Sequence, residues 1–370
     1  MILVKFGILV LNIIYFFIKL FPQRKRITFI SRQSNKKSDD ISLLEKEIKK
    51  RDSSIDVAVL CKKIEKGLAS KVKYFFHMFK QMYYLSTSKV IILDGYCICA
   101  SVLKKKKNTT IIQMWHALGA FKKFGLSIID SEEGTSSKLS KVMKMHKNYD
   151  YILTSSSNTR RYFKDAFGYD INRVIVMPLP RVDYLTDKKR KKEVIKKVIK
   201  KYPQCKSKKN IIYVPTFRKG MEDIDKINEL INCIDYSKYN LIVKPHPLSN
   251  IKIKDERVIC DKYFSSIDMI TMGDYVITDY SAIVFEASIL EKPLFFYCYD
   301  YDKYYRRRNF YINYKEEMPG IITDDAKEIV NSIENNQFDL DRVEGFRDKY
   351  IELNEGKCTS NLVDFIFKFM

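Results

Sequence analysis

Short apolar runs, separated by longer stretches of mixed polarity, divide the chain into predicted strands and helices. In the first half, helical stretches alternate with such runs at residues 27–31, 56–61, 89–94, 110–114 and 151–155. A second set of runs follows at residues 210–214, 240–244, 275–278 and 293–297, with helices predicted near 223–233 and 282–290. Strands that alternate with helices are typical of parallel sheets. The pattern therefore predicts an α/β protein with two Rossmann-like domains.

A lysine-rich segment separates the two sets of strands. We expect an interdomain linker and basic helix at residues 181–205, between domains at residues 23–180 and 206–370. Within the linker, a stripe of Val194, Ile195, Val198 and Ile199 recurs at helical spacing among lysines. Two interpretations of this helix remain open: a solvated helix packed by its short apolar stripe, or a contact for anionic headgroups or an anionic acceptor.

Residues 1–22 form an apolar segment of their own. Only Lys5, Asn12 and Lys19 interrupt the run before Pro22, and basic residues follow directly. The most apolar stretch, residues 6–18, is shorter than the about 20 residues that a bilayer crossing takes. No small-residue cleavage site follows, so a removed signal peptide is disfavoured. We expect a helix that lies on a membrane, with a true span or an ordinary buried helix as alternatives.

Charge sets the chain apart from an average globular protein. Its 67 Lys and Arg against 45 Asp and Glu give a net charge of +22, which suits nucleic acid, anionic lipid or a polyanionic polymer, or simply solubility. No recognisable nucleic-acid module is present, and basic residues do not interleave with an aromatic platform, so nucleic acid is not expected as a partner. The eight cysteines lack paired spacing, which favours a reducing compartment.

The segment Gln113–Gly125, QMWHALGAFKKFG, is the strongest candidate for an active-site loop. His116 follows a predicted strand, and ligands of open α/β sheets sit beyond the carboxyl ends of strands. An imidazole with an ordinary pKa near ~6.5 suits a general base for an alcohol. Lys122 and Lys123, just beyond, are weaker candidates for an acceptor phosphate. The alternatives are a core histidine and a solvated lysine pair.

Three further motifs mark predicted strand ends in the second half. In YVPTFR, Thr216 and Arg218 are candidates for donor phosphates, because arginine makes paired hydrogen bonds to phosphate. In KPHP, two prolines fix the direction of His246, which is a candidate hydrogen-bond donor to a pyrophosphate, with Lys244 sharing that charge. A structural residue at the strand end is the alternative for His246.

In VITDYSAIVFEA, Asp279 and Ser281 precede a predicted helix whose N-terminus would favour a phosphate. Simple capping of that helix is the alternative for both side chains.

Taken in this order, the four motifs resemble the CDP-glycerol glycerophosphotransferase family, the teichoic acid primases and polymerases. The resemblance implies a GT-B fold, with two Rossmann-like domains facing across a cleft. It implies that His116 accepts the proton of the acceptor hydroxyl, that His246 lies at the donor phosphates and that Glu286 faces the nucleotide. Arg181, in PLPRVD, matches a Pro-Arg-Asn-Asp element with Val182 in place of asparagine, and is a donor-binding candidate. Where family members often read WHGTP, this chain has Ala117, Leu118 and Gly119 after the histidine.

The resemblance therefore implies transfer of a glycerol or ribitol phosphate from a CDP-activated donor to a lipid-linked anionic acceptor, with release of CMP. It places the enzyme at the cytoplasmic face of a bacterial membrane, and an anionic membrane surface is an expected partner. A GT-B glycosyltransferase acting on a nucleotide sugar is the alternative. No cofactor is expected. Asp300 and Asp302 match an Asp-x-Asp metal pattern, but they follow the last predicted strand, so no metal site is expected either.

Overall fold

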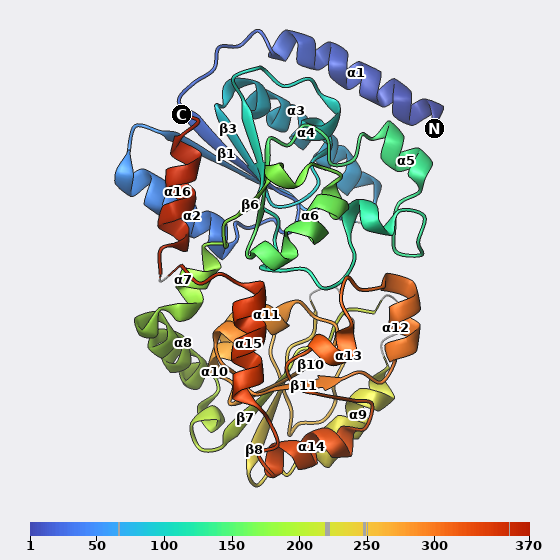
Figure 1. Ribbon diagram of the computed structural model, residues 1–370, viewed down its shortest axis with the longest axis vertical. Coiled ribbons are helices and arrows are strands. Elements are labelled where there is room, and N and C mark those ends of the chain that lie inside the picture. The colour runs from blue at the N-terminus through green and yellow to red at the C-terminus, as the bar shows by residue number, and fades with distance from the viewer. Residues whose placement is uncertain (66, 219–222, 247–248, 250, 355) are drawn as a thin grey trace. The chain divides into compact units, whose positions relative to one another are not determined.

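The computed structural model describes residues 1–370 except 66, 219–222, 247–248, 250 and 355 (Figure 1). Its contacts divide the chain into two compact units. The first unit comprises Met1–Asp183 and Glu352–Met370, and the second comprises Tyr184–Ile351.

A six-stranded parallel sheet forms the centre of the first unit, in the order β2-β1-β3-β4-β5-β6. The strands are β1 (Arg26–Ser31), β2 (Asp56–Cys61), β3 (Val90–Leu93), β4 (Thr110–Gln113), β5 (Tyr151–Thr154) and β6 (Val174–Val176). The apolar runs at residues 27–31, 56–61, 89–94, 110–114 and 151–155 match the first five within a residue at each end. Register pairs Ile91 of β3 with Ile111 of β4, both fully buried, so β3 and β4 end side by side.

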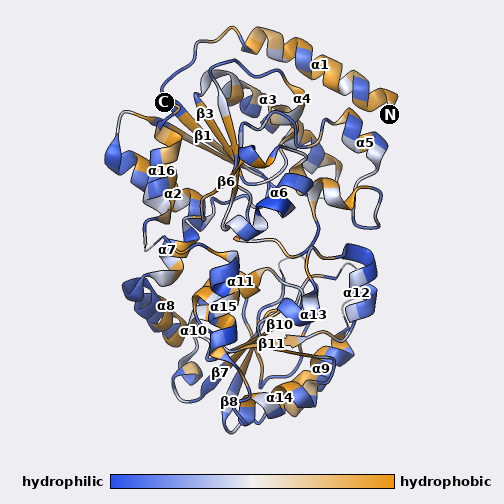
Figure 2. Cartoon of the chain, viewed as in Figure 1, coloured by the Kyte–Doolittle hydropathy of each residue, from blue (hydrophilic) through white to orange (hydrophobic). Residues whose placement is uncertain are grey.

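Helices cover this sheet. They are α1 (Ile2–Ile18), α2 (Asp39–Arg51), α3 (Leu68–Thr87), α4 (Ile98–Val102), α5 (Ser137–Val142), α6 (Arg160–Phe167), α7 (Arg181–Thr186), which begins here and ends in the second unit, and α16 (Cys358–Phe367). Figure 2 shows α1 as largely hydrophobic along its length. Only Leu11 and Tyr15 of α1 are buried, whereas Phe6, Phe16 and Phe17 are more than half exposed. No helix in the described ranges is long and apolar enough to cross a membrane.

The last helix, α16, belongs to the first unit, although the sequence grouped residues 206–370 together. Asp183 accepts hydrogen bonds from the backbone N–H groups of Cys358 (3.0 Å) and Thr359 (2.8 Å), and so caps the start of α16. Asp364 pairs with Arg51 of α2 at 2.5 Å. Phe365 packs edge-on against Tyr151 of β5, with ring centroids 5.1 Å apart. These long-range contacts have no signature in local sequence.

A second six-stranded parallel sheet, in the order β12-β11-β10-β7-β8-β9, forms the centre of the second unit. The strands are β7 (Lys209–Tyr213), β8 (Tyr239–Val243), β9 (Ile259–Cys260), β10 (Tyr275–Thr278), β11 (Leu294–Tyr297) and β12 (Ile321–Thr323). The sequence predicted β7, β8, β10 and β11, and two parallel sheets confirm the predicted α/β class. The short strands β6, β9 and β12 had not been predicted.

Eight helices belong wholly to the second unit: α8 (Lys188–Lys201), α9 (Ile224–Cys233), α10 (Ser266–Met272), α11 (Ile283–Ile289), α12 (Tyr301–Arg308), α13 (Tyr314–Glu317), α14 (Ala326–Glu334) and α15 (Leu340–Tyr350), counted over the described residues. The basic helix α8 buries Val194 and Val198, as its apolar stripe predicted. Arg190 of α8 pairs with Asp268 of α10 at 2.5 Å. Helix α8 is therefore a packed part of this unit whose lysines face solvent.

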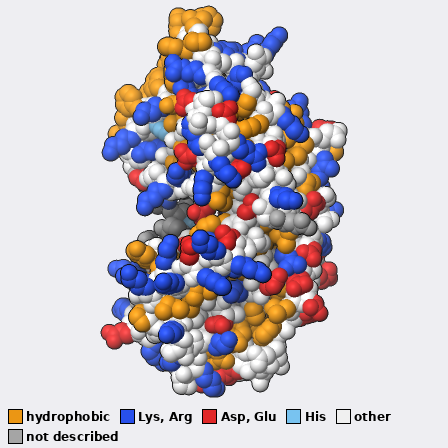
Figure 3. Space-filling model, turned by 90° about the vertical axis from the view of Figure 1, so that its left-hand side faces the viewer, with side chains coloured by type: hydrophobic (Ala, Val, Ile, Leu, Met, Phe, Trp, Pro, Cys, Tyr) orange, Lys and Arg blue, Asp and Glu red, His pale blue; other side chains and the backbone are white. Residues whose placement is uncertain are grey.

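The basic excess is widely distributed. On the face drawn in Figure 3, Lys and Arg side chains are scattered over much of the surface and interspersed with Asp and Glu. A scattered distribution of this kind does not single out one acidic partner, so charge alone assigns no binding surface.

Candidate active site

His116 lies three residues beyond the end of β4, in the loop that the sequence singled out. Its Nδ1 is 2.8 Å from the backbone carbonyl oxygen of Asp94, which follows the neighbouring strand β3. The side-chain amide nitrogen of Gln33 lies 3.1 Å from the same ring atom. Because a carbonyl oxygen can only accept, the shorter contact, to Asp94, assigns the proton to Nδ1. The lone pair of His116 is therefore on Nε2, the tautomer that a general base requires.

Burial keeps this imidazole neutral. It lowers the pKa of His116 to about 4, although the hydrogen bond to Asp94 opposes the shift, and the nearby positive charge of Arg181 lowers the pKa further. The sequence-based expectation of an ordinary pKa near ~6.5 is therefore wrong. At neutral pH essentially every molecule carries His116 in its proton-accepting form.

Trp115 holds the loop in an uncommon conformation directly before His116. Its φ is +63°, a left-handed value that a bulky aromatic residue rarely adopts. The backbone N–H of Trp115 donates to the side-chain oxygen of Gln113 at 3.0 Å, and its indole stacks on Phe124 with centroids 4.8 Å apart. The Trp115 and His116 rings are 4.2 Å apart. The strain, of order 1–3 kcal/mol, is thus held by packing that also covers the imidazole.

Arg181 lies in the first unit, near His116, and is held by Asp40. The Asp40 carboxylate accepts from the Arg181 backbone N–H at 2.8 Å, from Nε at 2.9 Å and from Nη2 at 2.5 Å. Asp40 is 1% exposed, so this pair is almost fully buried. The sequence predicted donor binding by Arg181. The structure gives it a further effect, a positive charge that disfavours protonation of His116.

Lys122 and Lys123 are half-buried in the same loop. The Lys122 ammonium lies 5.7 Å from the centre of the Phe121 ring, and Phe121 is itself buried. The Lys122 ammonium is thus placed over a buried aromatic ring of the same loop.

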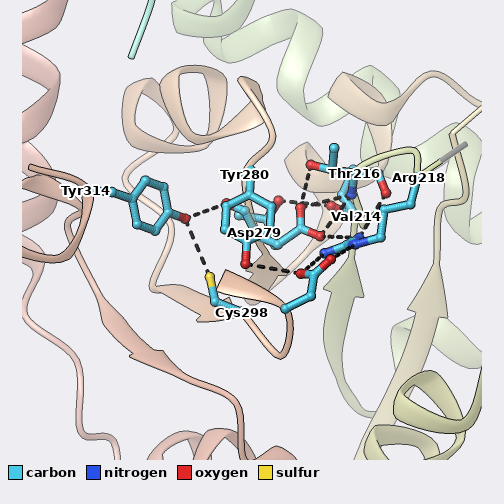
Figure 4. A network of polar contacts seen from close by, with 9 residues as sticks. Val214, Thr216, Arg218, Asp279, Tyr280, Cys298 and Tyr314 are labelled. Carbon is cyan, nitrogen blue, oxygen red and sulfur yellow. Dashed lines mark hydrogen bonds and ion pairs between the residues drawn. The ribbon is translucent and has the colours of Figure 1, made fainter. Parts of the chain in front are cut away.

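In the second unit, the residues predicted from YVPTFR and VITDYSAIVFEA form one buried network (Figure 4). Asp279, fully buried, accepts hydrogen bonds from the backbone N–H of Thr216 at 2.9 Å and from its hydroxyl at 2.5 Å. Arg218 pairs with Asp279 at 2.8 Å and with Asp300 at 2.7 Å and 2.9 Å. The tertiary fold therefore joins two motifs that lie more than sixty residues apart in the sequence.

Tyrosines enclose this network. Tyr280 donates to Asp300 at 3.1 Å, and Tyr314 donates to the backbone carbonyl of Asp279 at 2.7 Å. The Arg218 guanidinium lies 4.7 Å from the Tyr299 ring centre. Although burial lowers it, the pKa of Arg218 is raised overall by Asp279 and Asp300. Arg218 therefore stays charged with its guanidinium occupied, unlike the phosphate ligand that the sequence predicted.

Lys244 is also occupied. Its ammonium donates to the Asp261 carboxylate at 2.8 Å, to the Asp261 carbonyl at 3.2 Å and to the carbonyl of Phe264. These three bonds use all three protons of a side chain that is 8% exposed. These bonds fix the end of β8, and they replace the contact with a donor phosphate that the sequence predicted for Lys244.

His246, in contrast, is exposed, and its ring stacks on that of Phe217 with centroids 5.4 Å apart. Phe217 lies between Thr216 and Arg218, so the buried network positions the surface on which His246 rests. Pro247 of the KPHP motif lies outside the described residues. Phe217 was not singled out from sequence, and only its place between two candidates signalled it.

Ser281 and Glu286 belong to the start and middle of α11. The Ser281 hydroxyl accepts from the backbone N–H of Ile283 at 3.3 Å, a local bond in the turn before the helix. The N-cap of α11 is Ala282, without a side-chain capping bond, so the capping that the sequence left open as the alternative for Ser281 is not formed. Glu286 is 4% exposed and lies within the helix.

The two carboxylates of the Asp-x-Asp pair differ in their surroundings. Asp300 is bound by Arg218 and Tyr280, and Asp302 is exposed on the first turn of α12. In the part of the chain that the structure describes, no three or more His, Cys, Asp and Glu side chains form a group that could hold a metal ion.

Comparison with known proteins decides the family. The model of the CDP-Glycerol:Poly(glycerophosphate) glycerophosphotransferase family matches residues 13–368. The chain belongs to this family. The resemblance drawn from the four motifs is thereby confirmed, and the chain is a CDP-polyol phosphotransferase of the teichoic acid primase and polymerase class.

Relatives of this glycerophosphotransferase family include two primases. The teichoic acid ribitol-phosphate primase of Bacillus spizizenii is 32% identical over 359 residues, which cover 94% of this chain and 92% of the relative. The teichoic acid glycerol-phosphate primase of Bacillus subtilis is 34% identical over 300 residues, which cover 78% of this chain and 76% of the relative.

Among solved structures, the wall teichoic acid polymerase TagF superposes with a TM-score of 0.72 at 22% identity, covering 93% of this chain and 88% of that chain. At this identity the likeness shows the fold, which is GT-B-like with its two parallel sheets.

Proposed function

We propose that this family member transfers glycerol or ribitol phosphate from a CDP-polyol to a hydroxyl of a lipid-linked anionic acceptor. The observation that supports this most directly is His116, which is neutral and has Nε2 free to accept a proton. The acceptor oxygen attacks the β-phosphorus of the donor while Nε2 takes its proton. A new P–O bond forms, the bond to CMP breaks, and CMP departs. Positioning and charge stabilisation carry such a displacement more than covalent chemistry does.

In this proposal the residues of the second unit hold the donor. His246 and Ser281 supply hydrogen-bond donors for its phosphates, and Glu286 accepts a hydrogen bond from a hydroxyl of its ribose. The N–H and hydroxyl of Thr216 both donate to Asp279, so Thr216 positions the end of β7. Three further residues do not contact the donor themselves but hold the strand ends in place, because their charged groups are already engaged in ion pairs: Arg218, Asp279 and Lys244. Arg181, in the first unit, is the remaining donor-binding residue of this proposal, and Lys122 and Lys123 attract the anionic acceptor. The proposal requires both units to act on one pair of substrates, and the GT-B arrangement across a cleft is part of it.

The first test is product analysis with the full chain. Given CDP-glycerol or CDP-ribitol and a lipid-linked or short soluble acceptor, the chain is expected to release CMP and extend the acceptor. The reaction should continue in EDTA, because the proposed chemistry needs no metal. A nucleoside diphosphate released from a nucleotide sugar would instead support a glycosyltransferase. Activity lost in EDTA and restored by Mg²⁺ would contradict the metal-independent mechanism.

We propose further that α1 rests on the cytoplasmic face of a bacterial membrane. Its exposed face carries Phe6, Phe16 and Phe17, which are 63%, 67% and 62% exposed. On α3, which packs against α1, Phe76 is 64% exposed. An apolar face flanked by lysines is typical of helices that lie in the interface of anionic membranes.

This placement predicts that replacing Phe16 and Phe17 by Gln reduces sedimentation with anionic vesicles, and that added salt reduces it further. Each basic residue near such a surface contributes only about 1 kcal/mol, so the apolar face and the charges act together. The substitution is sharper than removal of residues 1–22, because Leu11 and Tyr15 are buried and a deletion would uncover their contacts. Tyr263→Gln, at a site 74% exposed in the second unit, is the control. Vesicle binding equal in all three proteins would refute the placement.

A further inference from the structure

A cavity of about 530 Å³ lies in the second unit, at the carboxyl ends of β11 and β12. Helices α12 and α13, neighbours in Figure 1, supply part of its wall. Among its lining residues, Tyr299 and Asp300 belong to the buried network around Arg218. Carboxyl ends of parallel strands are where ligands of such sheets bind. The cavity is therefore a candidate ligand-binding site.

Three cations line the cavity: Lys303 and Arg306, one turn apart on α12, and Lys315 on α13. All three are exposed. Within the described ranges none of them forms an ion pair, and the Lys315 ammonium rests 4.6 Å from the Tyr301 ring centre. Lysine and arginine placed together without carboxylate partners are suited to a phosphate.

The inner wall of the cavity carries one carboxylate that is already engaged. Asp300 lines it, and its carboxylate accepts two hydrogen bonds from Arg218, at 2.7 Å and 2.9 Å, and a third from Tyr280. Because Arg218 also pairs with buried Asp279, the network keeps one negative charge. What a ligand meets at this wall is therefore a carboxylate held in place by Arg218 and Tyr280, and the three cations are the groups left to bind an anion.

Two further carboxylates, Asp302 and Asp324, also line the cavity and are exposed. Neither forms a hydrogen bond or ion pair through its side chain within the described part of the chain. A carboxylate repels a phosphate but accepts hydrogen bonds from hydroxyl groups. A cavity that mixes free cations with free carboxylates therefore fits a ligand that carries both phosphate and hydroxyl groups.

We propose that this cavity binds a polyol phosphate unit, with Lys303, Arg306 and Lys315 on the phosphate and Asp302 and Asp324 on the hydroxyls. The proposal rests on the proposed function for the identity of the polyol phosphate. Two substrates carry this chemistry: the acceptor or product chain, and the polyol end of the CDP-polyol donor.

Equilibrium binding separates these sources without relying on turnover. The probes are a short oligomer of glycerol phosphate, CDP-glycerol and inorganic phosphate, titrated by calorimetry into the full chain. The pocket variant carries Lys303→Gln and Arg306→Gln. The control variant carries Lys262→Gln and Lys327→Gln, which remove the same charge from two exposed positions in the same unit. Equal unfolding temperatures of the two variants establish that both are folded.

The pocket variant is expected to bind the oligomer at least about tenfold more weakly, the scale of one lost charge-assisted contact, while the control changes less than about twofold. If the pocket variant binds the oligomer more weakly but CDP-glycerol with unchanged affinity, the ligand is the acceptor chain. If it binds CDP-glycerol more weakly but the oligomer with unchanged affinity, the ligand is the donor. The proposal would be overturned if both probes bound the pocket variant as tightly as they bind the control variant. It would also be overturned if the oligomer bound neither variant.

The carboxylates give a second readout. In a chain with Asp302→Asn and Asp324→Asn, the ratio of oligomer affinity to phosphate affinity should fall, because repulsion is relieved for both probes but hydroxyl contacts are lost only for the oligomer. An unchanged ratio would reject the polyol part of the proposal. Failure of the proposed function is separate: it appears as absent CMP release from every CDP-polyol, whatever the titrations show.

Discussion

His116→Ala is expected to lower CMP release by at least about a hundredfold, the scale for loss of a general base. Its Nε2 is the proton acceptor that the loop after β4 presents, and alanine offers none. The fold should persist, because the imidazole makes a single hydrogen bond to the backbone, to Asp94. His77→Ala is a matched control: His77 lies in the same unit, and burial lowers its pKa too. Near wild-type release from His116→Ala would remove the residue from catalysis.

The pH profile of the same reaction tests the state of the base. The pKa of His116 is lowered to about 4, so the group loses its accepting lone pair only when the pH falls through that value. The wild-type kcat/KM should therefore stay level between neutral pH and about pH 5, whereas an unshifted histidine would produce a decline near ~6.5. A decline centred near the unshifted value would contradict a half-buried imidazole that stays neutral.

Arg218→Ala is expected to destabilise the second unit by about 3–5 kcal/mol, the cost of leaving buried carboxylates without their partner. The Arg218 side chain is 3% exposed, and the Asp279 side chain that it pairs with is 0% exposed. Urea unfolding should show an earlier transition for this unit. Lys238→Ala serves as the control. It removes an ion pair to Glu334 in which the Lys238 side chain is 61% exposed, and it should lower the free energy of unfolding by only about 0–1 kcal/mol.

The same variant decides between two roles for Arg218. A stability loss no larger than that of Lys238→Ala, together with weaker binding of CDP-glycerol, would return Arg218 to direct contact with the donor. Partial recovery of stability on adding Asp300→Asn would instead support the ion-pair network, because the second change removes one of the carboxylates left uncompensated.

Strand prediction succeeded where the apolar run was long enough to carry a signal. The run at residues 56–61 became β2 with the same bounds, because a nearly continuous apolar run of this length is typical of a strand in a parallel sheet. The missed strands β6, β9 and β12 contain two or three residues. A run of that length is equally common in loops, and only pairing with a neighbouring strand makes it part of a sheet.

Local sequence determined which residues end the strands, and therefore which motifs carry the candidate site. His116 and Thr216 were both found in this way, because strand length and polarity are written in a few consecutive residues. The same signals led to the family, which the comparison confirmed.

Tertiary structure decided what the charged groups at those strand ends do. The tautomer of His116 depends on a carbonyl that follows the adjacent strand β3, and its pKa depends on burial. The sequence predicted Arg218 and Lys244 as phosphate ligands, but the fold pairs them with Asp300 and Asp261, 82 and 17 residues away. A charged residue is visible in the local sequence, whereas its partner and its exposure to water are set by how distant segments pack. The sequence therefore determined where the chemistry lies, and only the fold determined which groups are free to perform it.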